Sequence, residues 1–262
     1  MRRDMMHELI TALQFLTRIH LFRDPKYDDG MFGRSVKFFP LIGIVAGSLL
    51  ALVVVLTGGW LPGTVRSTLL VTLSVFITGG LHCDGLMDTA DGLFSGRSRE
   101  RMLEIMKDSR VGAFGVISII LLLLWKWSLV HDMPDSILGA ALISMMTIAR
   151  FCMVIVILRF PYARPEGMGK AFALHAGSGA LGFAALTVAG LLGALYFIKG
   201  QLLFLTAVVA VCAAVLFAFW FGSWATRKVG GLTGDMYGAV TELTELVVLM
   251  VFVLSTYVKW VR

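Results

Sequence analysis

The chain has 262 residues, of which 58% are hydrophobic and only 15% are charged, and its mean hydropathy is +0.84. Soluble domains carry about 25% charged residues, so this composition excludes an ordinary soluble fold. The net charge of +6 does not indicate nucleic-acid binding, because basic residues in membrane proteins are explained first by topology. The three cysteines are widely spaced and indicate neither a disulfide framework nor a metal site. We expect one integral membrane domain over residues 1–262.

The N-terminal segment, residues 5–22, predicts an amphipathic helix that lies at the membrane interface. Glu8 and Arg18 interrupt its apolar pattern too early for a membrane span. The segment also lacks a small-residue cleavage site, so we do not interpret it as a signal peptide.

Seven apolar segments follow, each close to the roughly 20 residues that a helix needs to cross a bilayer. The predicted fold is therefore an all-α, polytopic transmembrane helical bundle. The predicted spans lie near residues 36–57, 64–82, 111–130, 137–159, 178–198, 202–222 and 237–258.

The distribution of Lys and Arg predicts the orientation of these spans. With a cytoplasmic N-terminus, the inside segments hold 17 Lys and Arg residues and the outside segments hold four. Cytoplasmic loops carry the excess of positive charge in membrane proteins. The sequence therefore predicts that residues 1–37, 83–110, 159–177 and 223–236 face the cytoplasm.

The segment 79–92 (GGLHCDGLMDTADG) places three carboxylates at the end of a predicted span. Asp84, Asp88 and Asp91 recur at i, i+4 and i+7, so on a helix they share an arc of about 60°. Carboxylate oxygens are suitable ligands for hard divalent cations. The alternative is a solvated acidic helix face, but no Lys or Arg within the motif neutralises it.

A second acidic group lies near the start of the last predicted span. Asp235, Glu242 and Glu245 fall within about 80° of helical arc. A carboxylate in the hydrocarbon region is unfavourable unless it is paired. We favour a role for this group at or around the metal site, and the alternative is pairing with Arg150 or Lys126.

Two further inside loops carry residues suited to phosphate binding. Arg164 and Glu166 lie in a loop rich in Pro and Gly. The other loop precedes a Gly-rich helix start at residues 112–115, where helix N–H groups attract anions. Its candidates are Lys107, Asp108 and Arg110. The alternative for the basic residues is a purely topogenic role.

These loops share one predicted side of the membrane, in a topology derived from Lys and Arg alone. Acidic ligands and basic phosphate contacts at one interface suggest metal-assisted phosphoryl transfer. Motifs for a serine hydrolase, a P-loop or a zinc protease are absent from the sequence.

Five ordered motifs run along the chain, namely FLTR at 15–18, FPLIG at 39–43, HxDGxxDxxDG at 82–92, ARPEGxG at 163–169 and GGxTGDxxGA at 230–239. With these motifs the sequence resembles the cobalamin synthase, or adenosylcobinamide-GDP ribazoletransferase, family. The resemblance covers nearly the whole chain, with one departure at His20, where the family often has Pro.

The resemblance implies transfer of adenosylcobinamide phosphate from its GDP-activated form to alpha-ribazole or alpha-ribazole 5'-phosphate, with release of GMP. It implies Mg²⁺, with Mn²⁺ as an alternative, and no nucleic acid. The lipid bilayer is an expected partner, and other cobamide-assembly enzymes are possible ones. The expected location is the cytoplasmic (inner) membrane of a bacterium or archaeon, with the N-terminus and the active-site loops cytoplasmic.

The resemblance also implies roles for the motif residues. An Asp or His82 would take the proton of the attacking hydroxyl. The expected substrate contacts are Lys107, Asp108, Arg110, Arg164 and Glu166. The expected metal ligands are Asp84, Asp88, Asp91, Asp235 and Glu242.

Two other functions remain open at this stage. A cation-coupled transporter also places carboxylates inside the membrane. A different membrane phosphotransferase, such as a CDP-alcohol enzyme, is the other alternative, but its DxxDGxxAR-like pattern is not met. Release of GMP without a membrane potential distinguishes the enzyme from the transporter.

Overall fold

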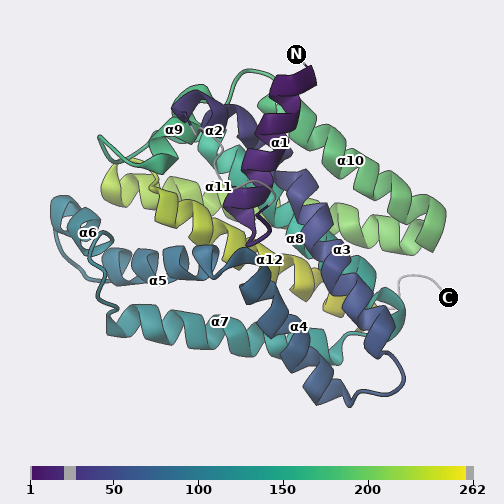
Figure 1. The fold of residues 1–262 in the computed structure, drawn as a ribbon. Coiled ribbons are helices and arrows are strands. Elements are labelled where there is room, and N and C mark those ends of the chain that lie inside the picture. Colours follow the sequence, from purple (N-terminus) through teal and green to yellow (C-terminus); the bar gives the residue numbers. More distant parts are fainter. Residues whose placement is uncertain (1, 21–27, 258–262) are drawn as a thin grey trace.

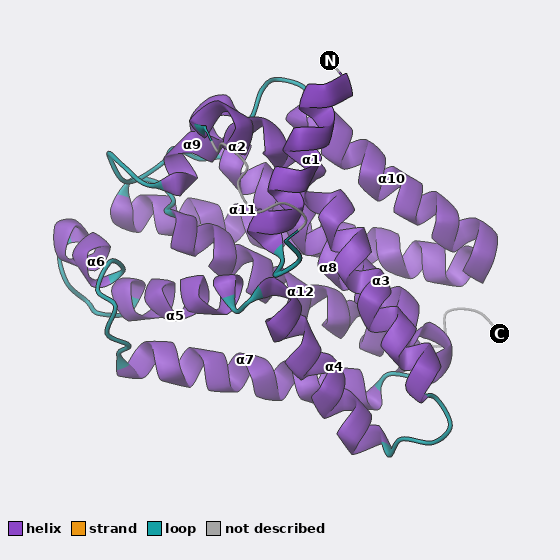
Figure 2. Ribbon diagram, in the orientation of Figure 1, coloured by secondary structure: helices purple, strands orange, loops and turns teal. Residues whose placement is uncertain are grey.

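The computed structural model describes residues 2–20 and 28–257. In this part of the chain every regular element is a helix, and the one β contact is an isolated bridge (Figure 2). The helices pack side by side with loops at the two ends of the bundle (Figure 1). The prediction of an all-α helical bundle is confirmed.

The helices are, in chain order, α1 (Arg2–Leu16), α2 (Asp29–Ser35), the 3-10 turn η1 (Val36–Phe38), α3 (Phe39–Thr57), α4 (Gly63–Thr78), α5 (Leu81–Leu93), α6 (Arg99–Ile105), α7 (Ala113–Asp132), α8 (Asp135–Arg159), α9 (Met168–His175), α10 (Ala180–Lys199), α11 (Gln201–Val229) and α12 (Gly234–Tyr257). Among the described residues, six segments are long and apolar enough to cross a membrane, namely 29–57, α7, α8, α10, α11 and α12.

Helix α8 forms the centre of the bundle. In its most apolar stretch 83% of the residues are buried, against 22% in the corresponding stretch of α10. Gly43 and Gly47 of α3 lie directly on the α8 backbone, where a Cβ would come within 2.4 Å of the Met146 carbonyl oxygen or 2.6 Å of the Ile143 Cα. Small residues four apart allow such close helix contact in membranes. This contact fixes α3 against α8.

The span predicted near 64–82 is half of a broken element. Helix α4 ends at Thr78, and α5 continues after a bend of 87°. Gly79 and Gly80 both adopt left-handed backbone conformations, with φ of 66° and 73°, which glycine adopts without steric penalty. With the broken pair counted as one, the structure has up to seven spans, in agreement with the predicted number.

The predicted interfacial helix at 5–22 is shorter in the structure, because α1 ends at Leu16. The polar residue Glu8 is buried, and its two carboxylate oxygens pair with Arg34 at 2.8 Å and Lys37 at 2.7 Å. Pairing explains how this carboxylate is accommodated against the apolar bundle. Residues 21 and 22 of the prediction lie outside the described part of the chain.

The loops predicted to face opposite compartments gather at opposite ends of the bundle (Figure 1). At one end, Arg66 of α4 pairs with Asp135 of α8, and the Lys199 ammonium lies 3.4 Å from the Ser136 carbonyl oxygen. At the other end, the loop after α8 pairs with the loop before α12. The chemical motifs all belong to this second end or to the helices that lead from it.

Candidate functional site

A short backbone pairing joins two of the predicted motifs. Tyr162 and Leu232 form a parallel bridge, with hydrogen bonds of 2.8 Å from the Leu232 N–H to the Pro161 carbonyl and from the Ala163 N–H to the Leu232 carbonyl. The bridge places the Arg164 guanidinium 2.7 Å from the Asp235 carboxylate. Two motifs about 70 residues apart in sequence therefore form one structural unit.

Glycines let the loop after α8 fold over Tyr162. Gly167 has a φ of 126°, and a Cβ there would lie 2.7 Å from the Tyr162 hydroxyl. A Cβ at Gly169 would lie 2.6 Å from the Tyr162 ring. Burial raises the pKa of Tyr162 above its usual value, so the phenol stays protonated at neutral pH. This tyrosine supports the loop that carries Arg164.

Helix α5 lies directly on the start of α12. A Cβ at Gly85 would come within 2.6 Å of the Asp235 carbonyl oxygen, and a Cβ at Gly238 would lie 3.1 Å from the His82 Cα. The glycines of both acidic motifs therefore have a steric role. They bring the first turn of α5, with Asp84, next to the first turn of α12, with Asp235.

The first two carboxylates of α5 face the contact between the first turns of α5 and α12, which forms the junction of the acidic motifs. Asp84 is exposed and Asp88 is partly buried. Asp84, Asp235 and Asp91 repel the charge of Asp88, whereas Arg164 attracts it. The structure thus brings Asp84, Asp88, Asp235 and Arg164 close to one another.

The third carboxylate, Asp91, has a different environment. It is buried, and its two oxygens accept hydrogen bonds from the Gly112 N–H at 2.7 Å and the Gly115 N–H at 2.8 Å. These N–H groups form the N-terminus of α7, which attracts negative charge. The anion at this helix start is therefore Asp91, where the sequence pattern indicated a substrate phosphate. A Cβ at Gly115 would lie 2.5 Å from Asp91, which explains the glycine.

The other predicted contacts in this region lie away from the junction. Asp108 and Arg110 pair with each other at 2.7 Å on the exposed turn before α7. Hydrogen bonds from Arg110 lower the pKa of Asp108 to about 2. Lys107 and Glu166 are exposed. In this structure none of these four residues lines either of the cavities beside Asp84 described below.

Glu242 and Glu245 belong to a buried ion-pair cluster. The Lys126 ammonium lies 2.5 Å from Glu242 and 2.6 Å from Glu245, and Arg150 pairs with Glu245. All four residues are at most 3% exposed. Two cations balance two carboxylates, so the geometry favours the pairing alternative over a metal site at Glu242.

His82 and Cys83 connect α5 to this cluster. The Cys83 thiol lies 3.4 Å from a Glu242 carboxylate oxygen. His82 is 1% exposed, and its Nε2 has no hydrogen-bond partner among the described residues. His82 also lines the smaller of the two cavities at Asp84, but its side chain is almost fully buried, so it is a less accessible proton acceptor than the exposed Asp84.

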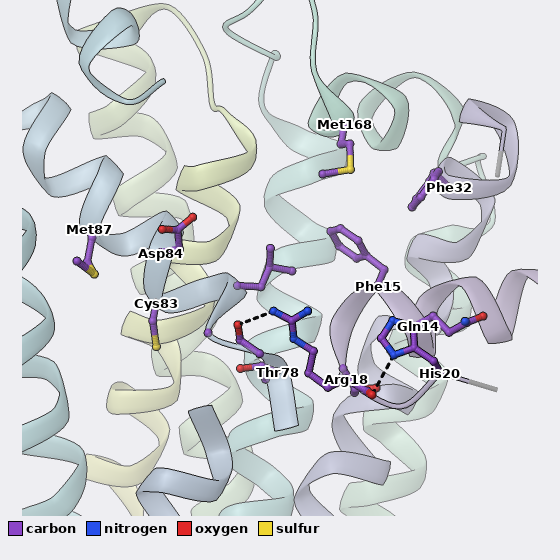
Figure 3. Close-up of a pocket in the computed structure, with 14 residues that line it drawn as sticks. Gln14, Phe15, Arg18, His20, Phe32, Thr78, Cys83, Asp84, Met87 and Met168 are labelled. Atoms are coloured by element: carbon purple, nitrogen blue, oxygen red, sulfur yellow. Dashed lines mark hydrogen bonds between the residues drawn. The ribbon is translucent and has the colours of Figure 1, made fainter. Parts of the chain in front are cut away.

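Two cavities meet at Asp84. The larger, about 690 Å³, lies between α1 and α5, and the smaller, about 210 Å³, contains Tyr162, Arg164 and Asp235. Asp84, Phe15, Leu81 and Met168 line both. Figure 3 shows Asp84 on one wall of the larger cavity, with Arg18 extending from the opposite wall.

Sequence reasoning did not assign a site role to Arg18. Its backbone N–H bonds to the Ile77 carbonyl at 2.8 Å, and its guanidinium donates to the Gly79 carbonyl at 3.2 Å. These are carbonyls at the break between α4 and α5. The FLTR motif at 15–18 and the Gly79-Gly80 pair were the available signals, but nothing in the sequence indicated that these two segments meet.

The donor set beside Asp84 suits a magnesium ion. Asp84, Asp88 and Asp235 offer the carboxylate oxygens that this ion prefers, and Mg²⁺ usually needs only one or two protein carboxylates together with substrate phosphates. In residues 2–20 and 28–257, no three His, Cys, Asp or Glu side chains are close enough to form a metal cage.

Comparison with known proteins gives consistent matches over nearly the full length. A family model for cobalamin-5-phosphate synthase matches residues 8–253. The adenosylcobinamide-GDP ribazoletransferase of Desulfitobacterium hafniense is 40% identical over 248 residues, covering 94% of this chain and 96% of that protein. The protein of the same name from Fusobacterium nucleatum is 35% identical over 274 residues, covering 94% and 97%. No solved structure matches.

Proposed function

The chain belongs to the cobalamin-5-phosphate synthase family, and we propose that it transfers adenosylcobinamide phosphate from adenosylcobinamide-GDP to alpha-ribazole or its 5'-phosphate. It is a transferase of cobalamin biosynthesis, since its relatives are named ribazoletransferases. In the proposed reaction the ribose hydroxyl oxygen bonds to the cobinamide-side phosphorus. The bond to the bridging oxygen breaks, GMP leaves, and the hydroxyl proton is lost.

The observation that carries this proposal is the junction of three distant motifs. Asp84 and Asp88 on α5, Asp235 on α12 and Arg164 on the loop after α8 meet beside two cavities. Carboxylates suited to a cation and an arginine suited to phosphate oxygens are the groups that phosphoryl transfer requires. Their convergence supports phosphoryl transfer at this end of the bundle.

We propose that Asp84 and Asp88 would hold the metal together with substrate phosphates, since Asp235 is paired with Arg164 in this structure. A bound Mg²⁺ would neutralise negative charge on the pyrophosphate. Asp91 instead holds α5 against α7, and Glu242 remains in the ion-pair cluster.

Arg164 is the proposed phosphate contact. Its guanidinium lies in the smaller cavity, paired with Asp235, and is held by the bridge at Tyr162. An arginine can offer two parallel N–H groups to one phosphate. We propose that it orients the pyrophosphate and stabilises the charge of the departing GMP. A carboxylate of α5, rather than the more deeply buried His82, is the proposed proton acceptor.

The chain is a multi-pass membrane protein, and we propose the cytoplasmic membrane with the junction on the cytoplasmic side. The excess of Lys and Arg in the loops at this end supports that orientation. Nucleotide substrates are polar and would reach the site from the cytoplasm. The buried carboxylates Glu242 and Glu245 are already neutralised by Lys126 and Arg150, which weakens the transporter alternative.

The test is release of GMP by detergent-purified protein supplied with adenosylcobinamide-GDP, Mg²⁺ and either acceptor. The proposal predicts stoichiometric formation of GMP and the joined cobamide, with no membrane potential. A folded, monodisperse preparation that forms neither product would contradict it. Movement of a solute across reconstituted vesicles without bond cleavage would favour the transporter.

A further inference from the structure

The larger cavity beside Asp84 contains a cation that the reaction proposed above does not use. Arg18 lines this cavity, and its side chain extends across it toward α5 (Figure 3). In the described part of the chain, no carboxylate lies within ion-pair distance of Arg18, and the Gly79 carbonyl is the acceptor of its guanidinium. A guanidinium has five N–H donors, so most remain available to a ligand.

The backbone at the helix break holds this arginine in place. A Cβ at Gly79 would lie 1.9 Å from the Arg18 Nε, so the side chain packs directly against the glycine backbone. The hydrogen bond from the Arg18 N–H to the Ile77 carbonyl fixes the main chain on the same element. The cation is therefore pre-positioned, which favours anion binding because little side-chain freedom is lost.

The remaining walls suit a flat aromatic group. Phe15, Phe32 and Met168 line the same cavity, and the rings of Phe15 and Phe32 lie 6.1 Å apart in an edge-to-face arrangement. A volume of about 690 Å³ is within the range of small-molecule sites. A nucleotide combines an aromatic base with a phosphate, whereas a corrinoid macrocycle with its attached GDP is much larger than this cavity.

We infer that the larger cavity binds the nucleotide acceptor and that Arg18 binds its 5'-phosphate. This inference rests on the proposed function. In phosphoryl transfer the attacking and departing oxygens lie roughly in line across the phosphorus. Two cavities that meet at Asp84 offer one side to each substrate. Arg164, in the smaller cavity, serves the pyrophosphate, which leaves Arg18 for the acceptor.

The experiment compares two acceptors, alpha-ribazole 5'-phosphate and alpha-ribazole, in wild type and in Arg18→Gln. We expect wild type to prefer the phosphorylated acceptor. In Arg18→Gln, kcat/KM for that acceptor falls roughly ten- to hundredfold, the loss expected for a charged hydrogen bond. The kcat/KM for alpha-ribazole changes little in this variant. Arg97→Gln removes an exposed cation outside both cavities and is expected to retain the wild-type preference.

If Arg18→Gln does not fold, Arg18→Lys tests whether Arg18 binds the acceptor phosphate. It keeps the charge but loses the paired N–H geometry, so the preference should fall less than in Arg18→Gln but measurably. Equal losses with both acceptors would assign Arg18 a structural role and overturn the inference. A raised KM for adenosylcobinamide-GDP in Arg18→Gln would also overturn the inference. A wild-type enzyme that does not prefer the phosphorylated acceptor would do the same. Absence of GMP release by wild type with either acceptor would instead refute the proposed function itself.

Discussion

Within the two acidic motifs, Asp84 and Asp88 are the described carboxylates that no hydrogen bond or ion pair takes up, because Asp235 is paired with Arg164. Asp91 is bound to two N–H groups, and Glu242 is paired with Lys126. Side chains that stabilise the fold and side chains available to a ligand thus occur within the same motifs. Substitution of single residues can distinguish the side chains that stabilise the fold from those available to a ligand.

Asp84→Asn and Asp88→Asn should each lower GMP release at ordinary Mg²⁺ by roughly a hundredfold or more, since even the partners of metal ligands are worth 10–100-fold. Asn keeps the shape but removes the charge that holds a hard cation. The thermal midpoint in detergent should stay near that of wild type. Raised Mg²⁺ should rescue part of the loss. Near-normal turnover in both variants would remove the metal from this site.

Arg164→Ala should raise the KM for adenosylcobinamide-GDP roughly tenfold or more, because a charged hydrogen bond to phosphate is lost. The matched control is Arg159→Ala, which removes an exposed arginine at the same end of the bundle. Steady-state kinetics, with the concentrations of both substrates varied, would measure the KM of each variant. If Arg164→Ala and Arg159→Ala behave alike, Arg164 has only a topogenic role.

At the level of the elements, the attachment of α5 to α7 depends on Asp91. Helix α5 leaves the break at Gly79 and Gly80 and ends beside the start of α7, where Asp91 binds two N–H groups. Without this carboxylate the helix N-terminus would hold buried donors that lack partners.

Asp91→Ala should therefore lower the free energy of unfolding by about 1–3 kcal/mol, the cost of leaving a buried polar group unsatisfied. Asp84→Ala, on the same helix but exposed, should change it by less than about 0.5 kcal/mol. Reversible unfolding in mixed detergent would measure both. Equal stability of the two variants, with activity lost in each, would return Asp91 to the set of metal ligands.

At the level of the whole molecule, the orientation can be tested with single cysteines in a protein whose three native cysteines are replaced by Ala. Ser136, at the start of α8, and Glu100, in α6, are exposed, and the turn between α7 and α8 lies at the opposite end of the bundle from α6 (Figure 1). Given the excess of Lys and Arg at one end, Ser136→Cys should react with an impermeant thiol reagent in intact cells. Glu100→Cys should react only after permeabilisation, and the reverse pattern would invert the proposed topology.

The sequence by itself determined the features that depend on local composition. Apolar runs predicted the helices that can cross a membrane, because span length follows directly from bilayer thickness. The motifs at 82–92, 163–169 and 230–239 identified the family and located the acidic and basic residues that meet at the junction.

Only the tertiary structure decided which of these residues face a cavity. Helical spacing places Asp84 and Asp91 on one face, but it cannot reveal that α7 begins against the far end of that face and binds Asp91. Likewise, periodicity groups Glu242 with Asp235, whereas the position of Lys126 on another helix determines its pairing. The contact between Arg18 and the break at Gly79 follows from packing between segments about 60 residues apart, which no local pattern encodes.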